Sequence, residues 1–173
     1  MQQVATRTPG QILGDRVVET MVEAGVTLAV YLPDSVLVPI TEALEAGQAI
    51  RTLVCSREDE GMAIAAGSSL AGGLPVVLME GSGVGFSGLI LARAKVMRSG
   101  FLVIASHAPA LGEKFDYHAA SRVVGAGVFG GLDIPYVTAT SADDLLVCVR
   151  RALETVVGQR TPVGVLVPPH VFA

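Results

Sequence analysis

Short apolar runs alternate along this chain with longer segments in which apolar residues recur at helical spacing. The runs end at Gly, Pro or charged residues, and several are rich in Val, Ile and Leu, which is typical of strands buried on both faces of a sheet. In the first longer segment, Ile12, Val17 and Met21 mark one apolar helix face. The pattern predicts strands at 26–32, 50–55, 75–79, 101–105, 134–138 and 163–167, helices at 9–24, 36–46, 58–71, 84–98, 118–130 and 142–157, and a loop over 106–117.

This alternation predicts an α/β fold with a doubly wound, six-stranded parallel sheet flanked by helices. At 173 residues we expect a single domain over 1–173. In such sheets ligands bind beyond the carboxyl ends of the strands. The segments that follow strands are 33–35, 57–58, 81–85 and 106–107, so we expect the functional site among them.

The most informative segment is 57–67, which reads REDEGMAIAAG and opens a helix directly after a strand. Acidic residues suit the first turn of any helix because they interact favourably with its dipole. The small residues that follow indicate a binding surface rather than an ordinary helix start, since they let another backbone or a flat ring approach closely. Glu58 stands nine positions before Gly67 in this run. A carboxylate at the mouth of such a surface is a candidate proton-transfer group.

Two further turns follow strands. Pro33, Asp34 and Ser35 all favour turns, and Ser35 could instead cap the next helix. The sequence at 83–88, Gly-Val-Gly-Phe-Ser-Gly, matches the dinucleotide fingerprint GxGxxG. It follows the third strand rather than the first, and no acidic residue ends the next strand to bind a ribose. NAD binding is therefore not expected.

The loop after the fourth strand lies between His107 and His118. A lone histidine is more often structural than catalytic, but its place at a strand end makes His107 a candidate for substrate binding. Lys114 or Arg122 could meet an anionic substrate, although a solvated loop face is the simpler interpretation of both.

Composition narrows the classes of function. The chain is 51% hydrophobic with a mean hydropathy of +0.58, yet no apolar run reaches the roughly 18 residues that a membrane span requires. The surplus of apolar residues favours an oligomer with a large subunit interface. The net charge of −4 and the absence of a basic run argue against a nucleic-acid partner.

Cys55 and Cys148 both fall in apolar segments without metal-ligand spacing, which favours buried thiols in a reducing compartment. The segment Met1–Thr8 lacks the pattern of a secretory signal, so we expect a cytoplasmic protein.

Three segments together resemble the pyrimidine-binding domain of thiamine diphosphate enzymes: 32–37 (LPDSVL), 58–67 and 82–85 (SGVG). Within that family the chain is most similar to the alpha subunit of sulfopyruvate decarboxylase and to the matching half of phosphonopyruvate decarboxylase. The order and spacing of the three segments fit the family's pattern over nearly the whole chain. Phe86 is a departure, since related decarboxylases often carry Asn there, and it leaves the substrate identity open.

The resemblance implies roles for particular residues. Glu58 is expected to be catalytic, hydrogen-bonding the aminopyrimidine ring of thiamine diphosphate and promoting the cofactor's deprotonation. The expected cofactor contacts are Pro33, Gly83, Val84 and Gly85 besides Glu58, with the glycines letting backbone approach the ring. Ser35 and Asp34 are expected to face the substrate together with His107. His118 and Ser35 complete the expected catalytic set, because thiamine decarboxylases carry active-site histidines near position 118.

The family's second domain carries Gly-Asp-Gly and a downstream Asn, which hold Mg²⁺ and the diphosphate. No Gly-Asp-Gly occurs between Met1 and Ala173, and no metal ligands are expected on this chain. We therefore expect the diphosphate-binding domain on a separate beta subunit, in a hetero-oligomer with two or more copies of each chain. This chain would then be inactive alone.

The resemblance thus implies one subunit of a two-subunit thiamine diphosphate-dependent decarboxylase acting on a small anionic 2-oxo acid, such as sulfopyruvate or phosphonopyruvate. Two alternatives remain open at this point. The same cofactor could serve carboligation, or the chain could be a non-catalytic nucleotide- or partner-binding module that uses the Gly83 loop.

Overall fold

The computed structural model describes residues 7–173, so residues 1–6, where most of the sequence argument about a secretory signal falls, lie outside the described residues. It contains a six-stranded sheet in which all neighbouring strands are parallel, in the order β2-β1-β3-β4-β6-β5. The predicted fold class is confirmed. The strands are β1 (Leu28–Tyr31), β2 (Arg51–Val54), β3 (Pro75–Glu80), β4 (Leu102–Ser106), β5 (Tyr136–Thr138) and β6 (Val163–Val167).

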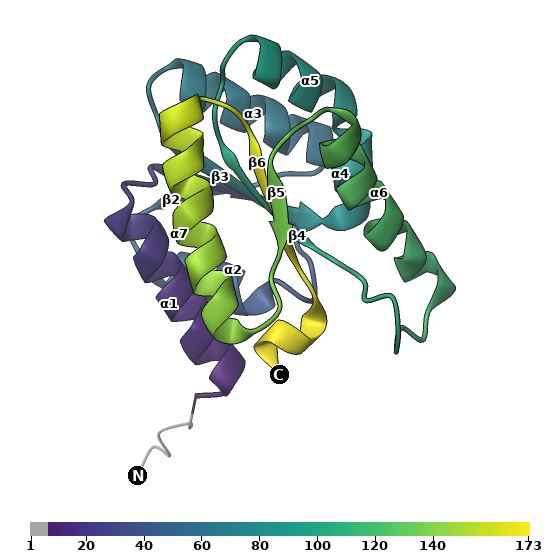
Figure 1. Ribbon diagram of the computed structural model, residues 1–173. Helices are drawn as coiled ribbons and strands as arrows, with labels where there is room; N and C mark the ends of the chain where they lie inside the picture. Colours follow the sequence, from purple (N-terminus) through teal and green to yellow (C-terminus); the bar gives the residue numbers. More distant parts are fainter. Residues whose placement is uncertain (1–6) are drawn as a thin grey trace.

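Helices cover both faces of the sheet, and each face has its own apolar cluster (Figure 1). Neighbouring residues of a strand serve opposite clusters: Val76 and Leu78 pack under α1 and α7, whereas Val77 and Met79 pack under α3, α4 and α5. The helices are α1 (Pro9–Glu23), α2 (Val38–Ala46), α3 (Glu58–Leu70), α4 (Gly81–Phe86), α5 (Gly88–Val96), α6 (Ala119–Gly131) and α7 (Ala142–Gln159), with 3₁₀ turns η1 (Asp116–His118) and η2 (Pro169–Phe172).

The two strands at the sheet edges are not buried on both faces. β3, β4 and β6 are almost fully buried, but β2 and β5 leave side chains such as Val54 and Tyr136 exposed. Each edge strand pairs on one side alone, which leaves its other side without a neighbouring strand. Composition cannot distinguish these positions, because an apolar run reads alike at the centre and at the edge.

The helix predicted at 84–98 is two helices in the structure. α4 begins at Gly81 and ends at Phe86, and α5 begins after Ser87. The hydroxyl of Ser87 is buried and donates to the carbonyl oxygen of Gly83 at 3.0 Å, which satisfies the polar group where the helix axis changes. The glycine-rich segment is therefore helical rather than a free turn, and its early start brings α4 to the end of β3.

Cys55 and Cys148 are buried free thiols, as predicted. None of the helices described is long and apolar enough to cross a membrane.

Candidate functional site

A cavity of about 660 Å³ lies at the carboxyl ends of β1, β3 and β4. From β1 the chain turns to β2 on one side, and from β3 it turns to β4 on the other, so this is the point where the winding of the sheet reverses. Crevices at such switch points are the usual ligand sites of doubly wound sheets, and the volume is typical of a small-molecule pocket. The structure thus places the cavity where the topology predicts it.

Six of the residues predicted from the sequence line this one cavity. They come from four separate segments and share no local sequence: Pro33, Asp34, Ser35, Glu58, His107 and His118. The sheet brings them together because parallel strands direct their carboxyl ends to the same edge.

Glu58 is the first residue of α3 and is only partly exposed. Its two acidic neighbours have partners of their own. Asp59 accepts a bidentate pair from the Arg57 guanidinium at 2.9 and 3.0 Å, which lowers the pKa of Asp59 below its usual value. Glu60 accepts from the backbone N–H of Ser56 at 3.3 Å. Within residues 7–173 no hydrogen bond or ion pair reaches the Glu58 carboxylate, so it is the one acid of this trio free to meet a ligand in the cavity.

Three predicted cofactor contacts lie on α4, and each has different surroundings. Gly83 lies against Glu58, and a β-carbon there would overlap the Glu58 side chain. Gly85 faces Val124 of α6 instead, where its lack of a side chain lets α4 and α6 pack closely. Val84 is fully buried in the apolar core. Of these three residues of α4, Gly83 is therefore the one whose missing side chain shapes the site, and the roles of Val84 and Gly85 toward a ligand remain predictions.

Asp34 organises the turn after β1. Its Oδ1 accepts from the backbone N–H groups of Val36 and Leu37 at 2.9 and 3.0 Å, and its Oδ2 accepts from the Ser106 hydroxyl at 2.8 Å. The alternative in which Ser35 caps α2 is wrong, because the helix begins at Val38 without a side-chain cap and Asp34 makes the turn. Ser35 is left exposed at the cavity wall with its hydroxyl available.

Sequence reasoning missed two acids that also line the cavity. Glu80 ends β3, and its Oε1 accepts from the buried Ser121 hydroxyl at 2.5 Å. Glu113, in the loop before η1, accepts from the backbone N–H groups of Lys114 and Phe115 at 2.8 and 3.0 Å and from His118 Nδ1 at 3.1 Å. These contacts, with the Phe115 amide the strongest, lower the pKa of Glu113 below its usual value. Glu80 could have been found in the sequence, because it is a charged residue at the end of an otherwise apolar strand.

The two histidines occupy different surroundings. His118 is paired with Glu113 and packs edge-on against the rings of Phe115 and Tyr117, with centroids 5.4 and 4.4 Å away. His107 follows β4, and its Nδ1 is buried without a hydrogen-bond partner among the described residues. Burial, and after it the charge of Arg122, lowers the pKa of His107 and favours the neutral ring.

The residues present fit the pyrimidine half of thiamine diphosphate. The fit rests on a free carboxylate, that of Glu58, facing a pocket-sized cavity, and on Gly83, where any larger residue would displace that carboxylate. In the described range no group of three His, Cys, Asp or Glu side chains is arranged to hold a metal ion.

Fold and site together define a class, a doubly wound α/β domain that carries a carboxylate-bearing cavity at its switch point. Residues 12–125 match the family model of the thiamine pyrophosphate enzyme N-terminal TPP binding domain. The chain belongs to this family.

Curated relatives agree with the family match. The chain is 31% identical over 122 residues to sulfopyruvate decarboxylase subunit alpha of Methanothermobacter thermautotrophicus, covering 70% of this chain and 74% of the relative. It is 26% identical to the subunit of the same name in Methanococcus maripaludis, covering 88% and 92%. It is 32% identical to phosphonopyruvate decarboxylase of Streptomyces hygroscopicus, covering 86% of this chain but 38% of that longer protein.

A solved 2-oxoglutarate:ferredoxin oxidoreductase from Magnetococcus marinus shares the fold. The TM-score is 0.75 at 16% identity, covering 92% of this chain and 29% of the oxidoreductase chain. This likeness concerns the fold alone.

Proposed function

We propose that this chain is the alpha subunit of a two-subunit thiamine diphosphate-dependent decarboxylase of a small anionic 2-oxo acid, such as sulfopyruvate or phosphonopyruvate. The observation that carries the proposal is the Glu58 carboxylate, which faces the cavity at the switch point and has no hydrogen-bond or ion-pair partner among residues 7–173. Membership of the N-terminal binding-domain family and the two relatives named as alpha subunits support it.

Thiamine diphosphate, when bound, supplies the electron sink that loss of CO₂ from a 2-oxo acid requires. The chain itself would orient the cofactor and transfer protons. Glu58 would hold a proton at a pyrimidine ring nitrogen, and Gly83 leaves the room that this geometry needs. Ser35, His107 and His118 line the same cavity and would contact the substrate. Phe115 and Tyr117, stacked with centroids 5.4 Å apart at the cavity wall, would limit the access of water.

The proposal includes a cytoplasmic beta subunit that carries the diphosphate half and Mg²⁺, in a hetero-oligomer with two or more copies of each chain. Large apolar side chains exposed on α4, α5 and α6 support a subunit interface, since Phe86, Leu89 and Val123 are each more than 60% exposed at 63%, 65% and 64%.

The first test isolates the chain with its native companion, identifies that companion by mass spectrometry, and assays CO₂ release from sulfopyruvate and phosphonopyruvate with thiamine diphosphate and Mg²⁺. A companion with Gly-Asp-Gly and CO₂ release are expected. In the same complex Glu58→Gln is expected to abolish exchange of the cofactor's C2 proton, measured by NMR. Glu60→Gln, which removes the same charge two residues away at an exposed position, is the matched control. Near-normal exchange in Glu58→Gln would contradict the assignment.

A further inference from the structure

Arg122 is a half-buried residue whose guanidinium has no acidic partner among residues 7–173. It lies in the first turns of α6, and its Nη1 donates to the carbonyl oxygen of Ala110 at 3.3 Å. Within residues 7–173 no carboxylate lies at ion-pair distance from it. Lys95, which is also partly buried, is paired with Asp133 at 2.9 Å, and the other unpaired basic side chains of the described range are exposed. No described carboxylate neutralises the charge of Arg122, so its guanidinium is free to attract an anion.

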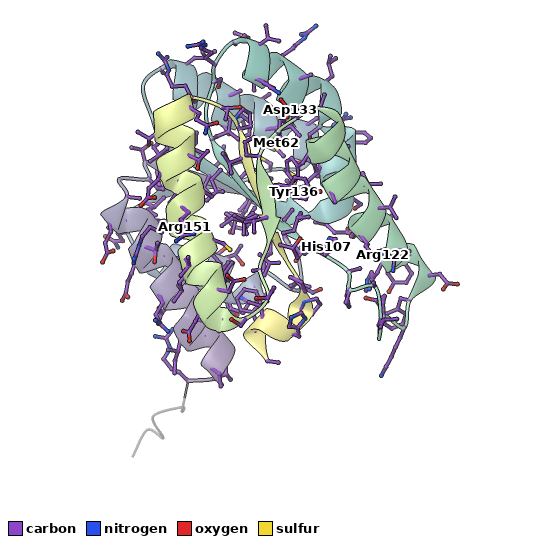
Figure 2. All side chains as sticks on the ribbon, viewed as in Figure 1. Met62, His107, Arg122, Asp133, Tyr136 and Arg151 are labelled. Carbon is purple, nitrogen blue, oxygen red and sulfur yellow. The ribbon has the colours of Figure 1, made fainter. Side chains whose placement is uncertain are left out.

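His107 carries a second unsatisfied group. The charge of Arg122 acts on His107, whose Nδ1 is buried without a partner among the described residues. Figure 2 shows His107 at the carboxyl end of β4 and Arg122 on α6. A neutral imidazole that carries its proton on Nδ1 can donate a hydrogen bond to an anionic oxygen. Arg122 and His107 can therefore both bind an anion.

The placement of Arg122 relates it to the cavity. Its own side chain is not part of the wall, but His107 and Ala108 after β4, His118 at the end of η1 and Ser121 of α6 are. His118 immediately precedes α6, and Ser121 is the sequence neighbour of Arg122. The acids of this region are already engaged, since Glu80 accepts from Ser121 and Glu113 from His118. An anion that reaches the guanidinium would therefore displace no carboxylate.

We propose that Arg122, together with His107, binds the second anionic group of the substrate, a phosphonate, sulfonate or second carboxylate at the end away from the reacting 2-oxo acid. The inference rests on the proposed function and names its specificity-determining residue. Lys114 is the poorer candidate, because it lies on an exposed loop, whereas Arg122 is half-buried on α6.

Arg122 also donates a hydrogen bond to the Ala110 carbonyl oxygen of the loop. If its role were purely structural, substituting it would weaken the binding of every ligand alike. The test therefore compares two probes that share a carboxylate, 3-phosphonopropanoate and propanoate, of which the first alone carries the second anion. Binding to the full-length chain is followed by NMR of the three imidazoles. His170, which bonds to the Thr140 carbonyl outside the cavity, is the internal reference.

We expect 3-phosphonopropanoate to shift the signals of His107 and His118 but not that of His170. Arg122→Gln is expected to raise the Kd of 3-phosphonopropanoate roughly 10-fold or more and to leave that of propanoate nearly unchanged, as loss of a charged hydrogen-bonded contact predicts. Arg93→Gln, which removes an exposed arginine of α5, is the matched control and should change neither.

An unchanged ratio of the two Kd values in Arg122→Gln would overturn the proposal, as would equal weakening of both probes. If that variant fails to fold by circular dichroism, Arg122→Lys takes its place. Lysine keeps the charge but not the planar fork, so the ratio should change in the same direction by a smaller factor, and an unchanged ratio would again overturn it.

The reconstituted complex separates the two proposals. CO₂ release from phosphonopyruvate with an unaltered KM in Arg122→Gln would support the decarboxylase and overturn the anion site. Arg122-dependent binding of 3-phosphonopropanoate without any CO₂ release would support the anion site and contradict the decarboxylase.

Discussion

The side chain of Glu58 runs across the face of α4 at Gly83, and a β-carbon added at position 83 would lie 3.0 Å from the Glu58 carboxyl carbon. The two residues are distant in sequence and belong to different helices, α3 and α4. A glycine in a helix costs stability, so its presence at this contact indicates that the room is needed. The carboxylate keeps its position in the cavity because α4 has no side chain there.

Gly83→Ala should therefore impair function more than stability. The added methyl group would push the Glu58 side chain aside, and a displacement of this size in a catalytic group can lower turnover roughly 10²-fold. The measurement is CO₂ release by the reconstituted complex, alongside thermal unfolding of the same variant.

Gly127→Ala in α6 is the control for that substitution, because nothing lies within 4 Å of the added carbon. This variant should retain activity and gain up to about 1 kcal/mol of stability from the better helix former. Equal activity in the two variants would contradict the role assigned to Gly83.

The turn that carries Pro33 and Ser35 should depend on the Asp34 carboxylate. Ser106→Ala removes one of its hydrogen bonds and is expected to lower the free energy of unfolding by about 1 kcal/mol. Asp34→Ala also removes the two backbone contacts to Val36 and Leu37, and should cost about 2–3 kcal/mol.

Urea unfolding of both single variants and of the double variant forms a cycle that measures the coupling. The double variant should be more stable than the sum of the single losses predicts, because either single variant already removes the contact between Ser106 and Asp34. Strict additivity would show that the two side chains do not interact in solution.

Tyr31 should make the stability of the protein fall at high pH. It is buried in β1 and donates to Oε1 of Glu45 on α2, and burial followed by this contact raises its pKa from 10.0 to about 12. The folded state therefore holds the phenolic proton more tightly than the unfolded chain does. The resulting stability is fully present below pH 10 and is lost as the pH rises through about 12.

Absorbance at 295 nm, which reports tyrosinate, should show a last ionisation step near pH 12 that is missing in Tyr31→Phe. The difference in unfolding free energy between the native protein and this variant should shrink between pH 10 and pH 12. A difference that stays constant over this interval would show that Tyr31 does not titrate as its surroundings predict.

Much of the fold and part of the site could be predicted from the sequence. Strand and helix order follow from short apolar runs and helical periodicity, and the strand ends in a parallel sheet necessarily share one edge. That is why Asp34, Glu58, His107 and His118, chosen for their positions in the pattern and for their resemblance to a family, line one cavity. The choice of Glu58 over Asp59 and Glu60 agrees with the pairing of its neighbours.

Other features required the tertiary structure because they depend on contacts between distant segments. Glu80 and Ser121 are 41 positions apart and Asp34 and Ser106 are 72 apart, and nothing local marks either pair. The lack of an acidic partner for Arg122 likewise depends on the residues packed around it. The local sequence shows only that a basic residue lies near a loop. The sequence by itself determined the parallel α/β fold and the edge at which a site forms, since both follow from local periodicity and strand direction. The tertiary structure alone decided which carboxylates are engaged and, among the described residues, which one is free and which cation lacks an acidic partner, because hydrogen bonding and burial are set by residues that meet only after folding.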